Sequence, residues 1–154
     1  MAKHSYHMVK GAALAVAPYS HYVDGGDGYV FITGQIGMTP GDDNAPIPQD
    51  MAAETRRTMD NLIIILKDAG LTLADVVAAR VFLTDFERDY ETMNATYRSY
   101  FKPGHLPART CIGVTALARG GKLEIDFICK RPAKAKRKAA KRATRRPAAV
   151  RRRR

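Results

Sequence analysis

Residues 50–84, DMAAETRRTMDNLIIILKDAGLTLADVVAARVFLT, contain the clearest local pattern in the chain. Asp50 is suited to cap a helix, and apolar residues then recur close to the helical period. Gly70 belongs to the residue type that commonly follows the C-terminus of a helix. The segment Asp75–Thr84 is rich in valine and other strand-forming residues, with room for a helical turn before it. This stretch therefore predicts a helix followed by a strand.

On the N-terminal side, the segment 6–22 mixes polar and apolar residues, and a glycine-rich turn at Asp24–Gly28 follows it. Tyr29–Thr33 is β-branched and aromatic, and it predicts a buried strand. On the C-terminal side, Phe86–Phe101 predicts a second helix, because large apolar residues recur at steps of four and three. That stripe, which we interpret as core packing, consists of Phe86, Tyr90, Met93, Tyr97 and Tyr100.

Two further strands are expected at Arg109–Leu117 and Lys122–Cys129, joined as a hairpin by the turn at 118–121. The resulting order is β-β-α-β-α-β-β. It predicts an α+β protein with one sheet and two helices packed on one face of it.

The charge of the chain is distributed unevenly. The 154 residues carry a net charge of +11, but 14 of the 26 basic residues lie between Lys130 and the C-terminus, where no acidic residue occurs. The rest of the chain has 12 basic and 15 acidic residues, a net charge of −3. The last segment lacks the apolar residues needed to offset the entropy of ordering. We therefore predict a globular domain at 1–130 and a basic, disordered tail at 131–154.

Cysteine content and hydropathy indicate the compartment. Cys111 and Cys129 do not make a disulfide framework, and we expect free thiols in a reducing environment. No apolar run approaches the length of a membrane span, and the first residues do not lead into a signal-peptide type of stretch. The sequence predicts a cytoplasmic protein.

Chemically informative residues gather in the two C-terminal strands. If Ile112 faces the core, alternation places Arg109 and Cys111 on the opposite face. Glu124 alternates with Leu123 and Ile125 in the same way. A hairpin would then bring Arg109, Cys111 and Glu124 together on the uncovered face of the sheet. A simpler explanation of the same pattern is an exposed ion pair between Arg109 and Glu124 and a small buried thiol at Cys111. Patterning alone favours this explanation by a small margin.

The motif Pro107-Ala108-Arg109-Thr110-Cys111-Ile112, followed by Lys122-Leu123-Glu124-Ile125, resembles the signature of the RidA family, also called the YjgF type. Five further segments are similar to the family in the same order: 17–20, 31–36, 62–70, 81–85 and 93–97. The resemblance covers roughly residues 10–130. It implies a chorismate-mutase-like fold and a homotrimer with active sites between subunits. It also implies hydrolysis of 2-aminoacrylate and its 2-iminopropanoate tautomer to 2-keto acids and ammonia, without metal or organic cofactor.

The resemblance also implies residue roles. Arg109 would bind the substrate carboxylate through its planar fork, and Glu124 would hold or deprotonate the attacking water. The other substrate-binding residues it implies are Tyr19, Gly34, Asn94, Thr110 and Cys111. Cys111 is interpreted as pocket wall rather than nucleophile, because no base is in evidence. Thr110 stands where members often have serine, and Gly113 where a larger residue is common, which leaves the preferred substrate open.

Two other functions remain open at this stage. The trimer could bind small carboxylates without turnover, while the tail binds nucleic acid non-specifically. The tail residues expected to contact phosphates are Lys134, Lys136, Arg137, Lys138, Lys141 and Arg142. Ribonuclease activity, attached to some relatives, ranks last because no histidine pair or metal cluster supports it.

Overall fold

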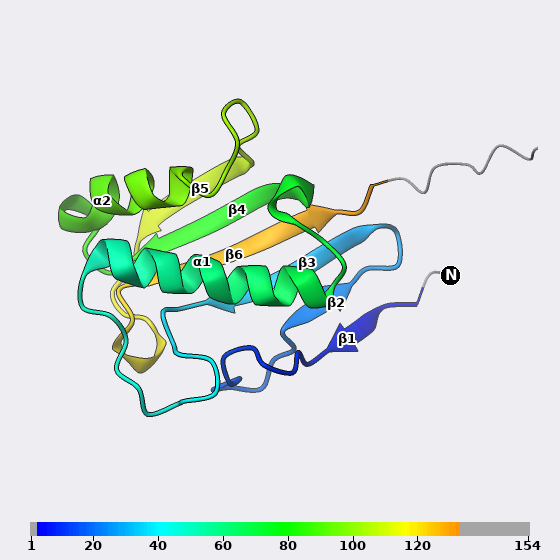
Figure 1. Ribbon diagram of the computed structural model, residues 1–154, viewed down its shortest axis with the longest axis horizontal. Helices are drawn as coiled ribbons and strands as arrows, with labels where there is room; N and C mark the ends of the chain where they lie inside the picture. Colours follow the sequence, from blue (N-terminus) through cyan, green and yellow to red (C-terminus); the bar gives the residue numbers. More distant parts are fainter. Residues whose placement is uncertain (1–2, 133–154) are drawn as a thin grey trace, which may run out of the picture.

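The computed structural model describes residues 3–132, which form one six-stranded sheet and two helices (Figure 1). The strands are β1 (Ser5–His7), β2 (Tyr22–Asp24), β3 (Tyr29–Gln35), β4 (Val76–Leu83), β5 (Ala108–Gly113) and β6 (Leu123–Lys130). The helices are α1 (Met51–Asp68) and α2 (Phe86–Arg98), with short 3-10 turns at Leu73–Asp75 and Ala118–Gly120. The order is β-β-β-α-β-α-β-β, one strand more before α1 than predicted. No helix in the described part is long and apolar enough to span a membrane.

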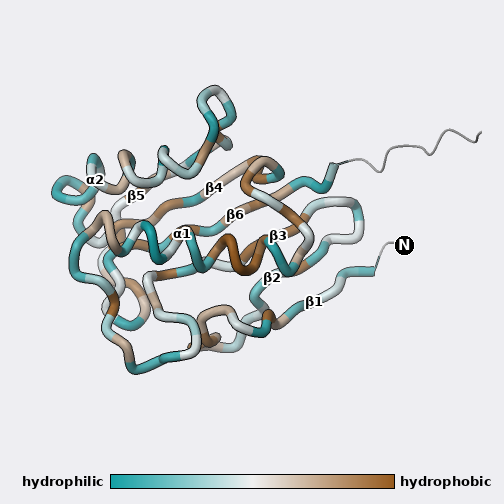
Figure 2. Tube along the Cα trace, in the orientation of Figure 1, coloured by the Kyte–Doolittle hydropathy of each residue, from teal (hydrophilic) through white to brown (hydrophobic). Residues whose placement is uncertain are grey.

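Both helices cover the same face of the sheet, as predicted. The spatial strand order is β1-β2-β3-β6-β4-β5. Helix α1 packs against β3 and β6, whereas α2 packs against α1 and β4 (Figure 1). Figure 2 shows the apolar run in the C-terminal half of α1, whose inward-facing residues Leu62, Ile65 and Leu66 are buried in the core.

The ends of α1 confirm the local sequence signals. Asp50 caps the helix, and its Oδ1 accepts a hydrogen bond of 2.8 Å from the backbone N–H of Ala53. Gly70, just beyond the C-terminus, has a φ of +68°, the left-handed conformation that glycine adopts without steric cost. The strand β4 and the helical turn before it were also predicted correctly.

Helix α2 ends at Arg98, earlier than the predicted Phe101. The hydroxyl and the backbone N–H of Ser99 both donate to the carbonyl of Thr96, which tightens the last turn and stops the helix. The aromatic stripe is core, as interpreted: Met93 and Tyr97 are buried, and the rest of the stripe packs against them.

The predicted hairpin between the last two strands is wrong. Within residues 3–132, β5 pairs only with β4, in parallel, and β6 lies between β3 and β4, antiparallel to both. The connection between β5 and β6 contains the 3-10 turn at Ala118–Gly120 and carries the chain past β4. Consecutive strands usually pair, and local sequence gives no sign of the intervening β4.

Within residues 3–132, no helix covers the face of the sheet opposite α1 and α2. β3 was predicted to be buried, but only alternate residues are: Val30 and Ile32 are in the core, whereas Phe31 is 48% exposed. Ile112 of β5 is 46% exposed. We call this surface the open face.

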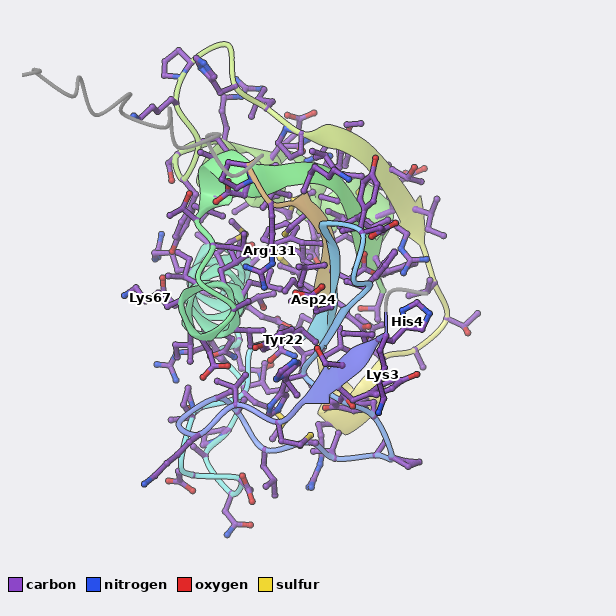
Figure 3. The ribbon with its side chains drawn as sticks, turned by 90° about the vertical axis from the view of Figure 1, so that its right-hand side faces the viewer. Lys3, His4, Tyr22, Asp24, Lys67 and Arg131 are labelled. Atoms are coloured by element: carbon purple, nitrogen blue, oxygen red, sulfur yellow. The ribbon has the colours of Figure 1, made fainter. Side chains whose placement is uncertain are left out.

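Arg131 ties the end of β6 to the body. Its Nη2 lies 2.9 Å from Oδ2 of Asp24 in β2, and its Nη1 donates to the carbonyl of Ala69 at 2.7 Å. In Figure 3, Arg131 lies between the end of α1 and Asp24. Nearby, the hydroxyl of Tyr22 donates to Asp68 at 3.2 Å. The contacts of the folded body therefore include Arg131.

Candidate active site

The register of the sheet decides on which face each candidate residue lies. Arg109 is aligned with Ala79 of β4 and Phe127 of β6, both in the core under the helices. Glu124 is aligned with Phe82 of β4 and Ile112 of β5, on the open face. Because residues paired across strands share a face, Arg109 and Glu124 lie on opposite faces of the sheet.

The predicted gathering of Arg109, Cys111 and Glu124 on one face is therefore wrong. Cys111 packs against the core, and Ile112 is the residue turned away from it. The prediction assumed that the more apolar residues of β5 face the helices. β5 carries apolar side chains on both faces, because the open face is itself partly apolar.

Arg109 belongs to a pocket of about 170 Å³ beside α2, which we call the guanidinium half-site. Its lining residues are Asn94, Tyr97, Arg98, Leu106, Pro107 and Arg109. The guanidinium carbon lies 5.1 Å from the ring centroid of Tyr97, in cation–π contact. Among the described residues, Arg109 has no carboxylate partner. Its planar fork of donors is thus oriented and available for an anion.

Tyr97 was predicted only as a core residue. It is buried, and burial raises the pKa of its hydroxyl to about 12, so that this side chain stays neutral beneath the guanidinium. The sequence held a signal for its place in this pocket. Asn94 and Tyr97 are three residues apart, so they share a face of the helix.

Glu124 belongs to a second pocket, of about 160 Å³, which we call the carboxylate half-site. Tyr19 and Gly34, predicted from the sequence, line it too. The other lining residues are Ala13, Leu14, Val16, Ala17, Thr33, Gln35, Ile36, Met38 and Ala118. A Cβ on Gly34 would collide with Oε1 of Glu124 and lie 2.8 Å from its Cδ. The absence of a side chain at position 34 therefore makes room for this carboxylate.

The surroundings of Glu124 favour its neutral form more than water does. Burial raises the pKa of this carboxyl above its usual range, the charge of Asp126 raises it further, and Arg80 lowers it. Arg80 is held on Asp126, with Nε 2.9 Å from Oδ2. A carboxylate with a raised pKa is a better proton acceptor near neutral pH.

The remaining candidates are less central. Thr110 is exposed and aligned with Arg80, which places it on the open face, and it lines neither pocket. Cys111 lines neither pocket either, and burial raises the pKa of its thiol while Arg109 lowers it. The six tail residues, from Lys134 to Arg142, lie outside the described residues. The described part contains no group of three or more His, Cys, Asp or Glu side chains placed to hold a metal ion.

The candidate residues thus occupy two separate pockets. One holds a guanidinium that has no carboxylate partner among residues 3–132, and the other holds a carboxylate with a raised pKa. They belong to an α+β protein with the YjgF fold. Residues 10–130 match the sequence model of the family described as "Endoribonuclease L-PSP". The chain belongs to this family, which is the RidA/YjgF family that the motifs resemble.

Relatives of known name are similar over most of their length. The chain is 36% identical over 124 residues to a 2-iminobutanoate/2-iminopropanoate deaminase of Escherichia coli, spanning 79% of this chain and 94% of the relative. It is 38% identical over 117 residues to the mouse protein of the same name, spanning 76% and 84%. The crystal structure of E. coli TdcF with bound serine matches with a TM-score of 0.74 and 34% identity, covering 83% of this chain and 99% of that one.

Proposed function

We propose that this protein hydrolyses small 2-imino acids and their enamine tautomers, of the 2-aminoacrylate/2-iminopropanoate type, to 2-keto acids and ammonia. The observation that carries the proposal is the guanidinium of Arg109, held face-on by Tyr97 in a small pocket and without a carboxylate partner among the described residues. The names of the relatives support the same reaction class.

The chemistry needs few groups, because a C=N carbon next to a carboxylate is already electrophilic. Arg109 binds the substrate carboxylate and orients the C=N carbon. Glu124 accepts a proton as water adds to that carbon, and it returns the proton to the nitrogen. The hydroxyl proton of the resulting carbinolamine then passes to the amino nitrogen, with Glu124 as the carrier, while the C–N bond breaks and the C=O bond forms, which leaves a 2-keto acid and ammonia. The raised pKa of Glu124 suits it to take and return this proton.

The proposal includes a homotrimer. Because the half-sites lie on opposite faces of one sheet, a small acid can engage both only if they come from different chains. The guanidinium half-site of one chain would meet the carboxylate half-site of the next. Such a head-to-tail contact closes into a ring, and the exposed apolar side chains Phe31 and Ile112 provide surface to bury.

The deciding experiment measures keto acid and ammonia released from 2-aminoacrylate that a second enzyme generates in the assay. We expect full-length protein to accelerate the release well above spontaneous hydrolysis, and Arg109→Ala to lose most of this acceleration. Protein that gives no acceleration would overturn the function. An Arg109→Ala variant as active as the parent would overturn the assigned site.

A second candidate function concerns the basic tail, and the charge distribution supports it: the segment from Lys130 onward has 14 basic residues and no acidic one. We propose weak, non-specific binding of nucleic acid through this tail. Gel shifts at two salt concentrations should compare the full chain with a chain ending at Pro132, which retains the Arg131 contacts. Binding should fall with salt and disappear on truncation. Binding that survives truncation would contradict the proposal.

A further inference from the structure

The wall of the carboxylate half-site depends on a loop without regular secondary structure. This loop, residues 9–20, provides Tyr19. It also provides four other lining residues: Ala13, Leu14, Val16 and Ala17. The width of the pocket in front of Glu124 therefore depends on where the loop is held.

The described hydrogen bonds hold this loop to the rest of the chain through one side chain. The N–H of Val9 donates to Nδ1 of His21 at 2.8 Å, and Nε2 of His21 donates to the carbonyl of Ala13 at 3.0 Å. The other bonds made by the loop stay inside it, such as the one from the N–H of Val16 to the hydroxyl of Tyr19 at 3.3 Å. His21 is thus the polar link between loop and sheet.

The backbone of His21 is itself fixed to the sheet. Its N–H donates to the carbonyl of His7 at 2.9 Å, and its carbonyl accepts from the N–H of Thr33 at 3.1 Å. The side chain is only 3% exposed. The imidazole therefore projects from a fixed point into the loop and bonds it at two places four residues apart.

The bonding pattern requires one form of the ring. Nδ1 accepts and Nε2 donates, which is possible only for a neutral imidazole with its proton on Nε2. Both nitrogens are occupied, so that neither is free for proton transfer. The role open to His21 is a structural one, directed at the loop.

We infer that His21 is a positioning residue for the carboxylate half-site: through Val9 and Ala13 it sets the place of the loop whose Tyr19 lines the same pocket as Glu124. The expected effect of His21 on enzyme kinetics rests on the proposed function, whereas its expected effect on the position of the loop does not. Loosening the loop should weaken substrate binding more than it slows the chemical step.

Three substitutions separate the two contacts. The amide of His21→Asn reaches the position of Nδ1 and can still accept from Val9. The amide of His21→Gln reaches the position of Nε2 and can still donate to Ala13. His21→Leu removes both contacts, and His105→Gln is a matched control at an exposed histidine. Asn and Gln remain polar at this buried position, which keeps the test valid if the leucine variant does not fold.

Kinetics and amide hydrogen exchange should be measured on the full chain. Losing two hydrogen bonds should raise KM roughly tenfold in His21→Leu, with kcat changed much less, and the single-contact variants should fall between. The amide of Val9 should exchange faster in His21→Gln and His21→Leu, but not in His21→Asn. Faster exchange of the loop with an unchanged KM would overturn the inference, as would unchanged exchange in His21→Leu.

The inference about His21 can be tested even if the proposed function is wrong. If the parent protein does not hydrolyse 2-aminoacrylate, the affinity for pyruvate, the product acid, replaces KM as the readout. An unchanged dissociation constant in His21→Leu would then overturn the inference. A weaker affinity together with faster exchange at Val9 would support it.

Discussion

The two half-sites present their charged groups in different ways. The guanidinium half-site is built mainly from regular elements: Arg109 projects from β5 onto the ring of Tyr97 in α2. The carboxylate half-site relies on an irregular loop and on the space left by Gly34. In the first, a strand and a packed helix fix the positions of Arg109 and Tyr97, whereas in the second the width of the pocket depends on the loop that closes it.

This difference suggests a division of work. Recognition of a carboxylate needs a fixed cation, which a strand and a helix provide with little conformational freedom. Proton transfer needs a base with a suitable pKa, and partial burial beside a loop provides it. Because the two halves face opposite sides of the sheet, each chain of the proposed ring would contribute one half to each of two sites.

The strongest test of this arrangement mixes two inactive proteins. Arg109→Ala should lower kcat/KM about a hundredfold through the lost charged hydrogen bonds, and Glu124→Gln by about two to four orders of magnitude through the lost base. After joint unfolding and refolding at equal amounts, random assembly should restore about a quarter of the parent activity, because that share of the interfaces pairs an intact Arg109 with an intact Glu124. A site contained in one chain would recover nothing.

Gly34→Ala should harm the carboxylate half-site while leaving the fold intact. The added Cβ would displace the carboxylate of Glu124, and the backbone of Gly34 does not have the positive φ that alanine avoids. We expect kcat to fall on the order of tenfold to a hundredfold, since misplaced catalytic groups cost about that much. Circular dichroism should match the parent, and a parent-like kcat would contradict the assigned place of Glu124.

A matched pair at Tyr97 tests the guanidinium half-site. Tyr97→Phe keeps the aromatic face and removes a buried hydroxyl without a described partner, so KM should stay close to that of the parent. Tyr97→Leu removes the cation–π contact, worth about 0.5–2 kcal/mol, and should raise KM from about twofold to thirtyfold. Steady-state kinetics should be used to measure KM for both variants. Equal KM values would mean that the ring does not orient Arg109.

The pH dependence of kcat/KM should follow the ionisation of Glu124 and should shift when the charges around this residue change. As a base, Glu124 must be ionised, so activity is present above its pKa and is lost as the pH falls through it. Arg80→Met removes the charge that lowers this pKa and should move the acidic limb of kcat/KM to higher pH. Asp126→Asn removes a charge that raises it and should move the limb to lower pH. Shifts in the same direction would exclude Glu124 as the titrating base.

Sequence reasoning predicted the local features well. The limits of α1 are encoded by Asp50 and Gly70, and the motifs predicted the family to which the chain belongs. Strand pairing was harder, since the position of β6 between β3 and β4 depends on contacts between residues far apart in the chain. The sequence did not decide which side chains of β5 point toward the helices, because the open face is also partly apolar. Ile112 was therefore predicted in the core, although it lies on the open face.

The two cysteines differ in a way that has experimental use. Cys129 is wholly buried, and burial raises its pKa to about 12, whereas Cys111 is only partly buried. A thiol-reactive fluorophore added to the native protein should therefore label Cys111 first, one position per chain on the strand that carries Arg109. Energy transfer between such labels would report the distance between neighbouring copies without any engineered cysteine.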